Sequence, residues 1–440
     1  DLCDQDAQKE SQELTFNHVA NFMYHMAQYE ELPEPRTMQR LEQTLLRKIA
    51  IKGGQKLTGP ADQRITFSNQ NMADECGYQT SESLRKFGDR QKGKNIDVGY
   101  GFEVDSETIE KAAMSITPHL VSNTLWALSA LKYKPGKALQ AAFDGLVEQS
   151  VDLYTDQSLS MTVFAYANLA MTPALSTLQK IVAECEQRVS TGKFTAQGLA
   201  NSFWGWAVLA YNPSSKLFDA YAKRFEEMAN DDKGDGLSRV DLVQIYQASL
   251  AFEHCVEDQG TGELHCDVSE SPKDSKNNAK RQLLKGALLR RAKEVWEQTS
   301  TGRVTISTLH REVSETLTLM GIPHEIEMLA DDNFSLDIAL RGRRVAIEVD
   351  GPSHFFANKP SEYMGADLLR EKVLKVKGWK VRFFVFGDRE LSPKPDQDSM
   401  SDEDSGNDSS DSSRAPSIRL DDKIYTLLSV PSLTATTREG

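Results

Sequence analysis

Apolar residues recur at spacings of three and four up to about residue 255, and this pattern predicts an almost entirely helical region. Within it, Trp126, Phe164 and Trp204 are separated by 38 and 40 residues. Each is followed by a leucine five residues later and a proline nine residues later, namely Leu131, Leu169, Leu209, Pro135, Pro173 and Pro213. We interpret the recurrence as a repeat of two helices, the first of which ends before the proline.

The second helix of each repeat is predicted at the amphipathic stretches 138–149, 174–189 and 216–228. Further copies are expected around residues 21–29 and where Ile245 aligns with Leu250, 41 residues after the third copy. Because one helical hairpin cannot bury its own apolar face, residues 1–256 are predicted to stack into an α-helical solenoid. The repeated aromatic side chains are expected to pack in its core rather than to stack on bases.

The pattern changes after this region. A polar linker at 257–279 precedes two connecting helices at 280–298 and 306–320. Short apolar runs at 324–328, 335–340 and 344–350 then predict strands, followed by a helix at 365–377 and a strand at 379–386. Residues 321–390 are thus predicted to form a small α/β domain. Together with the preceding helix at 306–320, its elements follow the order α-β-β-β-α-β. Residues 77–110 read as a mobile insertion, and the acidic tail at 391–440 as mostly disordered.

Composition narrows the function classes. The net charge of −14 argues against nucleic-acid binding by the chain as a whole, yet residues 273–390 carry 21 basic and 17 acidic residues. No apolar run is long enough for a membrane span. Five scattered cysteines fit a reducing compartment, and the pairs at 254–255 and 265–266 read as loop residues rather than zinc ligands. A kinase is excluded because we find no phosphate-binding glycine loop.

Two acidic residues stand out in the apolar strand at 345–350. Glu348 and Asp350 lead directly into the Gly351-Pro352 turn, and His354 follows. Acids in a buried strand are costly unless they are used or paired. They either form part of a site, or they stabilise the turn and pair with basic residues, the candidates being Arg343, Arg344 and Arg370.

The segments DIAL (337–340), VAIEVDGPSHF (345–355), LLREKVLKVKGW (368–379) and VRFFVF (381–386) resemble a RAP domain, an RNA-binding module of organellar RNA-processing factors. Upstream, FTAQGLANSFWGWAVLA (194–210) and NTLWALSALKY (123–133) resemble the helical repeats of FAST-kinase-like and octotricopeptide-repeat proteins. The resemblance implies binding of organellar transcripts, with a role in RNA processing, stability or translation. It also implies a restriction-endonuclease-like, PD-(D/E)xK fold for the C-terminal domain.

In that nuclease fold, acids on neighbouring strands hold Mg²⁺ beside the scissile phosphate. The resemblance places Asp337 and Glu348 at the two metal positions and Asp350 where the fold has its lysine. Lys372 on the following helix is the candidate replacement, so the hypothetical catalytic set is Asp337, Glu348, Asp350 and Lys372. Without a positive charge near the metal, the rate of RNA cleavage would fall sharply. We expect no cofactor unless the protein has this nuclease activity, which would require Mg²⁺.

Basic side chains beside these acids are the candidate RNA contacts, and they are Arg343, Arg344, His354, Arg370, Lys372, Lys375 and Lys380. His354 alternatively hydrogen-bonds Asp350, and the lysines alternatively form a solvated face. The leading hypothesis is a non-catalytic organellar RNA-binding protein, mitochondrial in preference to chloroplast. The alternatives are a metal-dependent endoribonuclease and a scaffold that binds protein partners through the solenoid.

Overall fold

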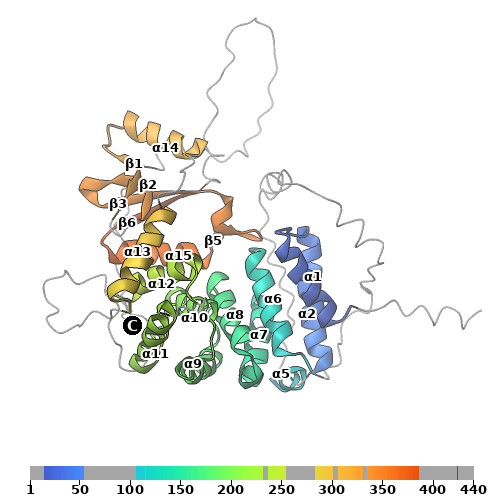
Figure 1. Ribbon diagram of the computed structural model, residues 1–440. Helices are drawn as coiled ribbons and strands as arrows, with labels where there is room; N and C mark the ends of the chain where they lie inside the picture. The colour runs from blue at the N-terminus through green and yellow to red at the C-terminus, as the bar shows by residue number, and fades with distance from the viewer. Residues whose placement is uncertain are drawn as a thin grey trace, which may run out of the picture. The chain divides into compact units, whose positions relative to one another are not determined.

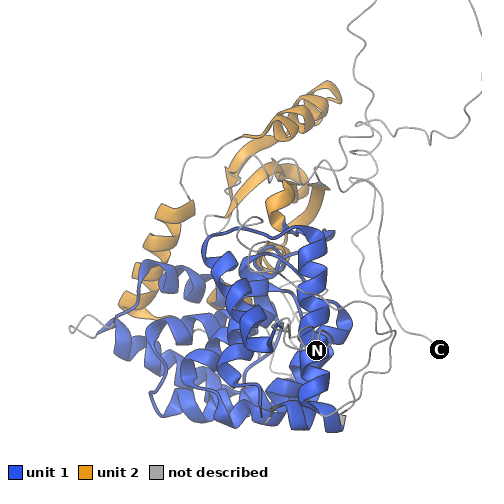
Figure 2. Cartoon of the chain, turned by 90° about the vertical axis from the view of Figure 1, so that its right-hand side faces the viewer, with its two compact units in different colours: residues 1–248, 355–368 blue, residues 249–354, 369–440 orange. Residues whose placement is uncertain are grey.

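The computed structural model describes residues 14–53, 106–113, 115–230, 236–253, 283–300, 306–330, 334–385 and 424. They divide into two compact units (Figure 2). Unit 1 comprises residues 1–248 and 355–368, and unit 2 comprises residues 249–354 and 369–440. The predicted linker at 257–279 lies outside the described residues, as does most of the predicted insertion and tail.

Unit 1 is an array of helical hairpins (Figure 1). The first helices of the hairpins are α1 (Phe16–Gln28), α6 (Pro118–Ala130), α8 (Asp156–Asn168), α10 (Ala196–Val208) and α12 (Arg239–Phe252). The second helices are α2 (Pro35–Lys52), α7 (Lys137–Ser150), α9 (Leu175–Ser190) and α11 (Ser215–Ala229). The three second helices predicted from amphipathic stretches are confirmed to within one residue. The short helix α5 (Ser106–Ala113) corrects the prediction of an insertion that continues to residue 110.

Four of the first helices, α1, α6, α8 and α10, have the same N-terminal cap and the same C-terminal turn. A threonine caps α1, α6, α8 and α10, and its hydroxyl accepts the N–H three residues later, as Thr155 does from Ser158. At the other end the residue after the C-cap takes a left-handed conformation, at Glu30, Lys132, Ala170 and Ala210. The next residue closes the turn, as when the Met171 N–H donates to the Tyr166 carbonyl at 2.9 Å. The repeat prolines follow these turns, and Pro33 extends the pattern to α1.

Helix α12 is the C-terminal member of the first helices. Its structure corrects the predicted alignment of the fourth copy of the repeat. Ser238 caps it reciprocally, because the Asp241 N–H donates to Ser238 Oγ and the Ser238 N–H donates to an Asp241 carboxylate oxygen. Counting nine residues from each cap gives Trp126, Phe164 and Trp204, and in α12 it gives Gln247 rather than Ile245. Ile245 is fully buried. The fourth copy therefore keeps the cap but replaces the aromatic side chain by an amide.

Neighbouring first helices pack closely, with α6 between α1 and α8, and α8 between α6 and α10. Gly205 lies in one such contact: a Cβ there would come within 2.7 Å of Val163 Cγ1. Because α6 and α8 have a first helix on both flanks, they lack a strong apolar–polar division, whereas the second helices are amphipathic.

A hairpin that the sequence analysis did not predict belongs to unit 1. Strands β4 (Phe355–Phe356) and β5 (Lys359–Tyr363) pair antiparallel. Asn358 exchanges hydrogen bonds with the backbone of Lys134, whose ammonium also contacts Glu362 at 2.8 Å. Residues from the C-terminal half of the chain thus complete the helical unit.

Unit 2 contains a four-stranded mixed sheet in the order β1-β2-β3-β6. Its strands are β1 (Glu325–Leu329), β2 (Ser335–Leu340), β3 (Val345–Asp350) and β6 (Lys380–Val385). The first three are antiparallel neighbours, and β6 pairs parallel to β3 after helix α15 (Gly365–Val376). The predicted α-β-β-β-α-β order of main elements is confirmed, as is the broader expectation of a helical region followed by a small sheet.

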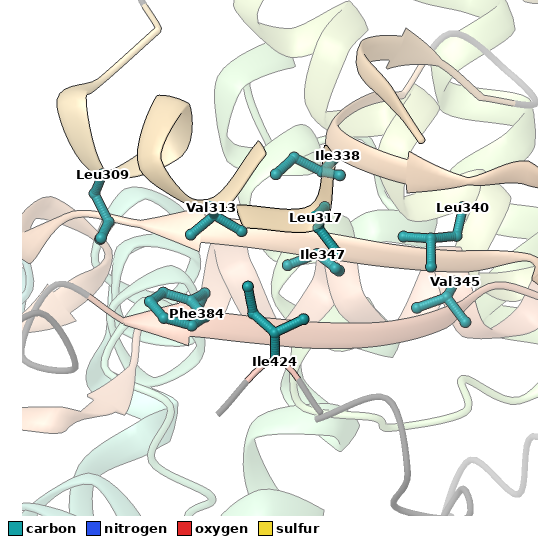
Figure 3. Packing of buried hydrophobic residues seen from close by; sticks show 9 residues of the cluster. All are labelled: Leu309, Val313, Leu317, Ile338, Leu340, Val345, Ile347, Phe384 and Ile424. Atoms are coloured by element: carbon teal, nitrogen blue, oxygen red, sulfur yellow. The ribbon is translucent and has the colours of Figure 1, made fainter. Parts of the chain in front are cut away.

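Helix α14 (Thr308–Leu319) covers one face of this sheet (Figure 3). Leu309, Val313 and Leu317 from the helix pack against Ile338, Leu340, Val345, Ile347 and Phe384. Ile424 belongs to the same cluster and is 1% exposed, so this residue of the predicted disordered tail is part of the core. Helix α13 (Gly286–Ser300) begins six residues later than predicted.

Among the residues that the structure describes, no helix combines the length and apolar character required to cross a membrane.

Candidate functional site

The first helices of unit 1 carry three aligned rows of side chains. Positions two, six and nine after the helix cap share one face, because spacings of four and three residues bring side chains together. The row at position two is Asn17, His119, Gln157, Gln197 and Val240. The row at position six is Asn21, Asn123, Met161, Asn201 and Gln244. The row at position nine is Tyr24, Trp126, Phe164, Trp204 and Gln247.

Exposure decreases from the first row to the third. All five residues of the first row are exposed, four of the second are half-buried, and in the third Trp204 is only 5% exposed. In the third row, Tyr24 contacts Trp126 with ring centroids 5.1 Å apart, and Phe164 contacts Trp204 at 5.2 Å. The repeated aromatic residues thus pack against one another, as predicted, while Tyr24, Trp126 and Phe164 remain partly exposed.

The second row is mostly made of carboxamides, and we call its members Asn21, Asn123, Asn201 and Gln244 the amide row. Gln244 Nε2 donates to Asn201 Oδ1 at 3.2 Å, and Asn123 Nδ2 lies 3.1 Å from His119 Nε2. Gln244 Oε1 is buried and has no hydrogen-bond partner among the described residues. A carboxamide offers both donors and acceptors, so this row can read the edges of unpaired bases.

At one end, the amide row borders a groove of about 1030 Å³ within unit 1. Asn201 and Gln244 line it, together with the cations Lys193 and Arg224. Two nitrogens of Arg224 already have partners, because the guanidinium pairs with Glu227 and donates to the Gly192 carbonyl. Its Nε is buried without a partner among the described residues. The acids Glu227 and Asp241 line the groove as well, so its charges are balanced and its amides are the groups that suit an unpaired base.

The predicted RNA-binding cations of unit 2 are largely engaged within the protein. Arg344 donates to the Lys377 carbonyl at 2.7 Å and stacks on Trp379, and Lys375 pairs with Glu371 at 2.5 Å. The remaining candidates are placed as follows: His354 lies 3.6 Å from Asp350, Arg370 pairs with Glu348, Lys372 is half-buried on α15, and Arg343 and Lys380 are exposed. Their assignment to RNA remains a prediction.

Three carboxylates lie in register across the sheet of unit 2. The pairing of Ile326 with Ile338, continued by one residue, places Glu327 opposite Asp337. The pairing of Ile338 with Ile347, continued in the same way, places Asp337 opposite Glu348. Glu327 has a left-handed backbone at φ 51°, a strained conformation for a side chain other than glycine. The two acids predicted for a metal site are therefore neighbours, with a third acid beside them.

A positive charge lies beside these acids, and it belongs to Arg370. The role suggested for Lys372 beside a metal stays a prediction. The Nη2 of Arg370 contacts Glu348 Oε2 at 2.5 Å and also donates to the Ser335 carbonyl. Burial raises the pKa of Glu348 to about 7; the charge of Arg370 opposes this shift, and Asp337 and Asp350 add to it. Glu348 Oε1 is buried without a hydrogen-bond partner among the described residues. The predicted pairing of Glu348 with an arginine is thus realised by Arg370.

Sequence reasoning missed the amide row, as well as Glu327 and His310 beside the acids. The amide row has a sequence signal: a Thr or Ser cap is followed six residues later by Asn or Gln at Thr15, Thr117, Thr195 and Ser238. The aromatic and leucine positions obscured this signal, because they are the stronger part of the repeat. No comparable local signal marks Glu327 or His310, since they meet only through strand register and helix packing.

No protein-family model matches the chain. The resemblance of residues 337–390 to a RAP domain therefore depends on the sequence motifs quoted above.

Proposed function

We propose that this protein is a non-catalytic RNA-binding factor of an organelle, the mitochondrion in preference to the chloroplast, acting in RNA processing, stability or translation. The observation that carries the proposal is the amide row, repeated at one register on the first helices of unit 1. The organelle and the processes rest on the resemblance to RAP-domain and FAST-kinase-like proteins. The RAP-like, restriction-endonuclease-like identity of the C-terminal domain is part of the same proposal.

Single-stranded RNA suits this face better than a duplex does. The rows present neutral amides and partly exposed aromatic rings, which bind unpaired bases by hydrogen bonding and stacking. A chain with a net charge of −14 gains little from general attraction to phosphates, so base contacts must carry much of the affinity. We therefore expect binding that depends on sequence and varies less with salt than that of a basic protein.

The pairing of Glu348 with Arg370 favours a non-catalytic C-terminal domain. A carboxylate must be ionised to hold Mg²⁺, and burial raises the pKa of Glu348 to about 7. A metal at Glu348 would also compete with the guanidinium that already contacts Oε2. The endoribonuclease hypothesis keeps one supporting observation, the register of Asp337 and Glu348 on neighbouring strands.

The test is crosslinking of the tagged protein to RNA in cells, followed by sequencing. The wild-type chain should enrich a few organellar transcripts. A variant with Asn123→Ala, Asn201→Ala and Gln244→Ala should lose this enrichment. A control with Gln179→Ala and Gln187→Ala should retain it, because these two exposed amides lie on the second helix α9.

The other hypotheses give different results in the same experiment. Reads that end sharply at one position, and lose that end in a Glu348→Ala variant, would replace the proposal by the endoribonuclease. Equal enrichment by the amide-row variant and the wild type would remove the amide row from RNA binding. Absence of enrichment above background would leave the protein-binding scaffold.

A further inference from the structure

A histidine and two carboxylates from three separate elements meet in unit 2. They are His310 of α14, Glu327 of β1 and Asp337 of β2. One candidate ligand atom from each lies within 4.8 Å of the other two. This set differs from the acids of the nuclease hypothesis, because it includes an imidazole and leaves Glu348 paired with Arg370.

The imidazole of His310 is almost completely buried yet lacks normal hydrogen bonds. It is 4% exposed, and its Nε2 has no partner among the described residues. Its Nδ1 points at Glu327 Oε1 from 3.5 Å, which is longer than an ordinary hydrogen bond. Buried polar atoms are normally satisfied, and Nδ1 faces the carboxylates without a conventional hydrogen bond, so an ion between them would supply its partner. The orphan Nε2 lies on the other side of the ring and is not explained by this ion.

One oxygen of each carboxylate already accepts a hydrogen bond from the protein. The Val349 N–H donates to Asp337 Oδ2 at 2.7 Å, and the Ser335 hydroxyl donates to Glu327 Oε2 at 3.1 Å. Such bonds orient a carboxylate and leave its other oxygen available for a metal. Two ligand atoms of a tetrahedral zinc ion lie roughly 3.3 Å apart, given metal–ligand distances of about 2.0–2.1 Å. The 3.5 Å between His310 Nδ1 and Glu327 Oε1 is close to this separation.

The surrounding charge favours a cation. Glu327, Asp337, Glu348 and Asp350 lie near one another, and Arg370 pairs with Glu348. Burial raises the pKa of Glu327, and the charge of Asp337 adds to this shift, whereas the Ser335 hydrogen bond and the charges of His310 and Arg370 oppose it. Arg370 thus lies near all four carboxylates, and a bound cation would further reduce the repulsion between Glu327 and Asp337.

We propose that His310, Glu327 and Asp337 bind a divalent transition metal of the zinc class. An imidazole together with carboxylates suits Zn²⁺, whereas Mg²⁺ prefers oxygen ligands alone. Three protein ligands leave a fourth position for water. The metal joins α14 to strands β1 and β2 and relieves the repulsion between Glu327 and Asp337. The proposal is independent of RNA binding, which involves unit 1.

The test uses the full chain, freed of metal by a chelator and titrated with Zn²⁺. Metal content and the thermal midpoint are measured for the wild type, Glu327→Gln and Asp337→Asn. Glu325→Gln is the matched control, because Glu325 lies on the same strand and pairs with the exposed Arg341. Titration with Co²⁺ then shows by its absorption whether thiolates are among the ligands, which separates this site from any site formed by the cysteines.

We expect the wild type and the control to bind one equivalent more Zn²⁺ than either variant, with at least a tenfold difference in affinity. Zn²⁺ should raise the midpoint of the wild type and the control but not of the variants. The Co²⁺ spectrum of the equivalent lost in Glu327→Gln should lack thiolate charge transfer. Equal Zn²⁺ content in the wild type and Glu327→Gln, or a thiolate band in that equivalent, would overturn the proposal.

Discussion

At the residue scale, a buried carboxylate (Asp144) and a half-buried one (Glu42) join consecutive repeats of the helical unit. Asp144 on α7 accepts the Tyr166 hydroxyl at 2.7 Å and the Ala174 N–H at 3.0 Å, both from the following repeat. Glu42 on α2 likewise accepts from the Tyr133 hydroxyl and the Gly136 N–H. Each acid satisfies an otherwise orphaned N–H at a helix start and fixes the register of two hairpins.

The Asp144 junction predicts a pH dependence of stability. Burial raises the pKa of Asp144 and outweighs the hydrogen bonds from Tyr166 and Ala174. The folded state therefore keeps this proton to a higher pH than the unfolded chain, and the resulting stability is lost as the pH rises through the raised pKa. Urea unfolding from roughly pH 4 to 7 should show a smaller fall in stability for Asp144→Asn than for the wild type. An equal fall would contradict this account.

A second residue-scale prediction concerns the Glu348–Arg370 pair. Arg370→Met leaves the buried carboxylate of Glu348 without its partner, which should cost on the order of 3 kcal/mol of unfolding free energy. Adding Glu348→Gln should recover most of the loss, because the buried group is then neutral. The measurement is a double-mutant cycle by chemical denaturation. Additive losses would show that the two side chains do not depend on each other.

At the element scale, the left-handed turn after each first helix lacks the glycine that this conformation favours. Ala170 has φ 47°, so Ala170→Gly should stabilise unit 1 by about 0.5–1 kcal/mol. Ala165→Gly in the interior of the same helix is the control and should destabilise by about 1 kcal/mol or more. Thermal unfolding of the two variants gives the comparison. A loss of stability in Ala170→Gly would show that the turn is not strained.

The start of α15 also predicts an element-scale effect. A Cβ at Gly365 would lie 2.0 Å from the Ala167 carbonyl oxygen, whereas a Cβ at Gly342 would meet nothing within 4 Å. Gly365→Ala should therefore lower the stability of unit 1 by about 1–3 kcal/mol through overpacking, and Gly342→Ala should change little. The midpoints of thermal unfolding test this pair. Equal midpoints would mean that residues 355–368 do not pack against the helices of unit 1.

Elements with a strong local pattern were predictable from the sequence. Residues 335–340 alternate and lie between turn residues, and the strand has these bounds in the structure. The hairpin at 355–363 was missed because Pro360 and the FFANK run lack alternation. The predicted alignment of the fourth repeat is wrong by two residues, because Ile245 matches the apolar pattern whereas the spacing from the Ser238 cap gives Gln247. The contact between Arg370 and Glu348 depends on how α15 packs on the sheet, which no local pattern encodes.

At the scale of the whole molecule, the chain joins a net acidic helical unit that carries the uncharged amide row to a unit in which several predicted cations are paired within the fold. The predicted cations Arg344, Arg370 and Lys375 already have partners in unit 2. With a net charge of −14, attraction to phosphates is a weak basis for RNA affinity. The account therefore assigns base recognition to the first helices of unit 1.

Crosslinking of the protein to RNA by ultraviolet light, followed by mass spectrometry of the nucleotide-bearing peptides, tests this assignment most directly. We predict adducts on the first helices of unit 1, at or beside His119, Trp126 and Phe164, and their loss in the amide-row variant. Adducts confined to residues 341–382 of unit 2, or to the second helices, would contradict the assignment.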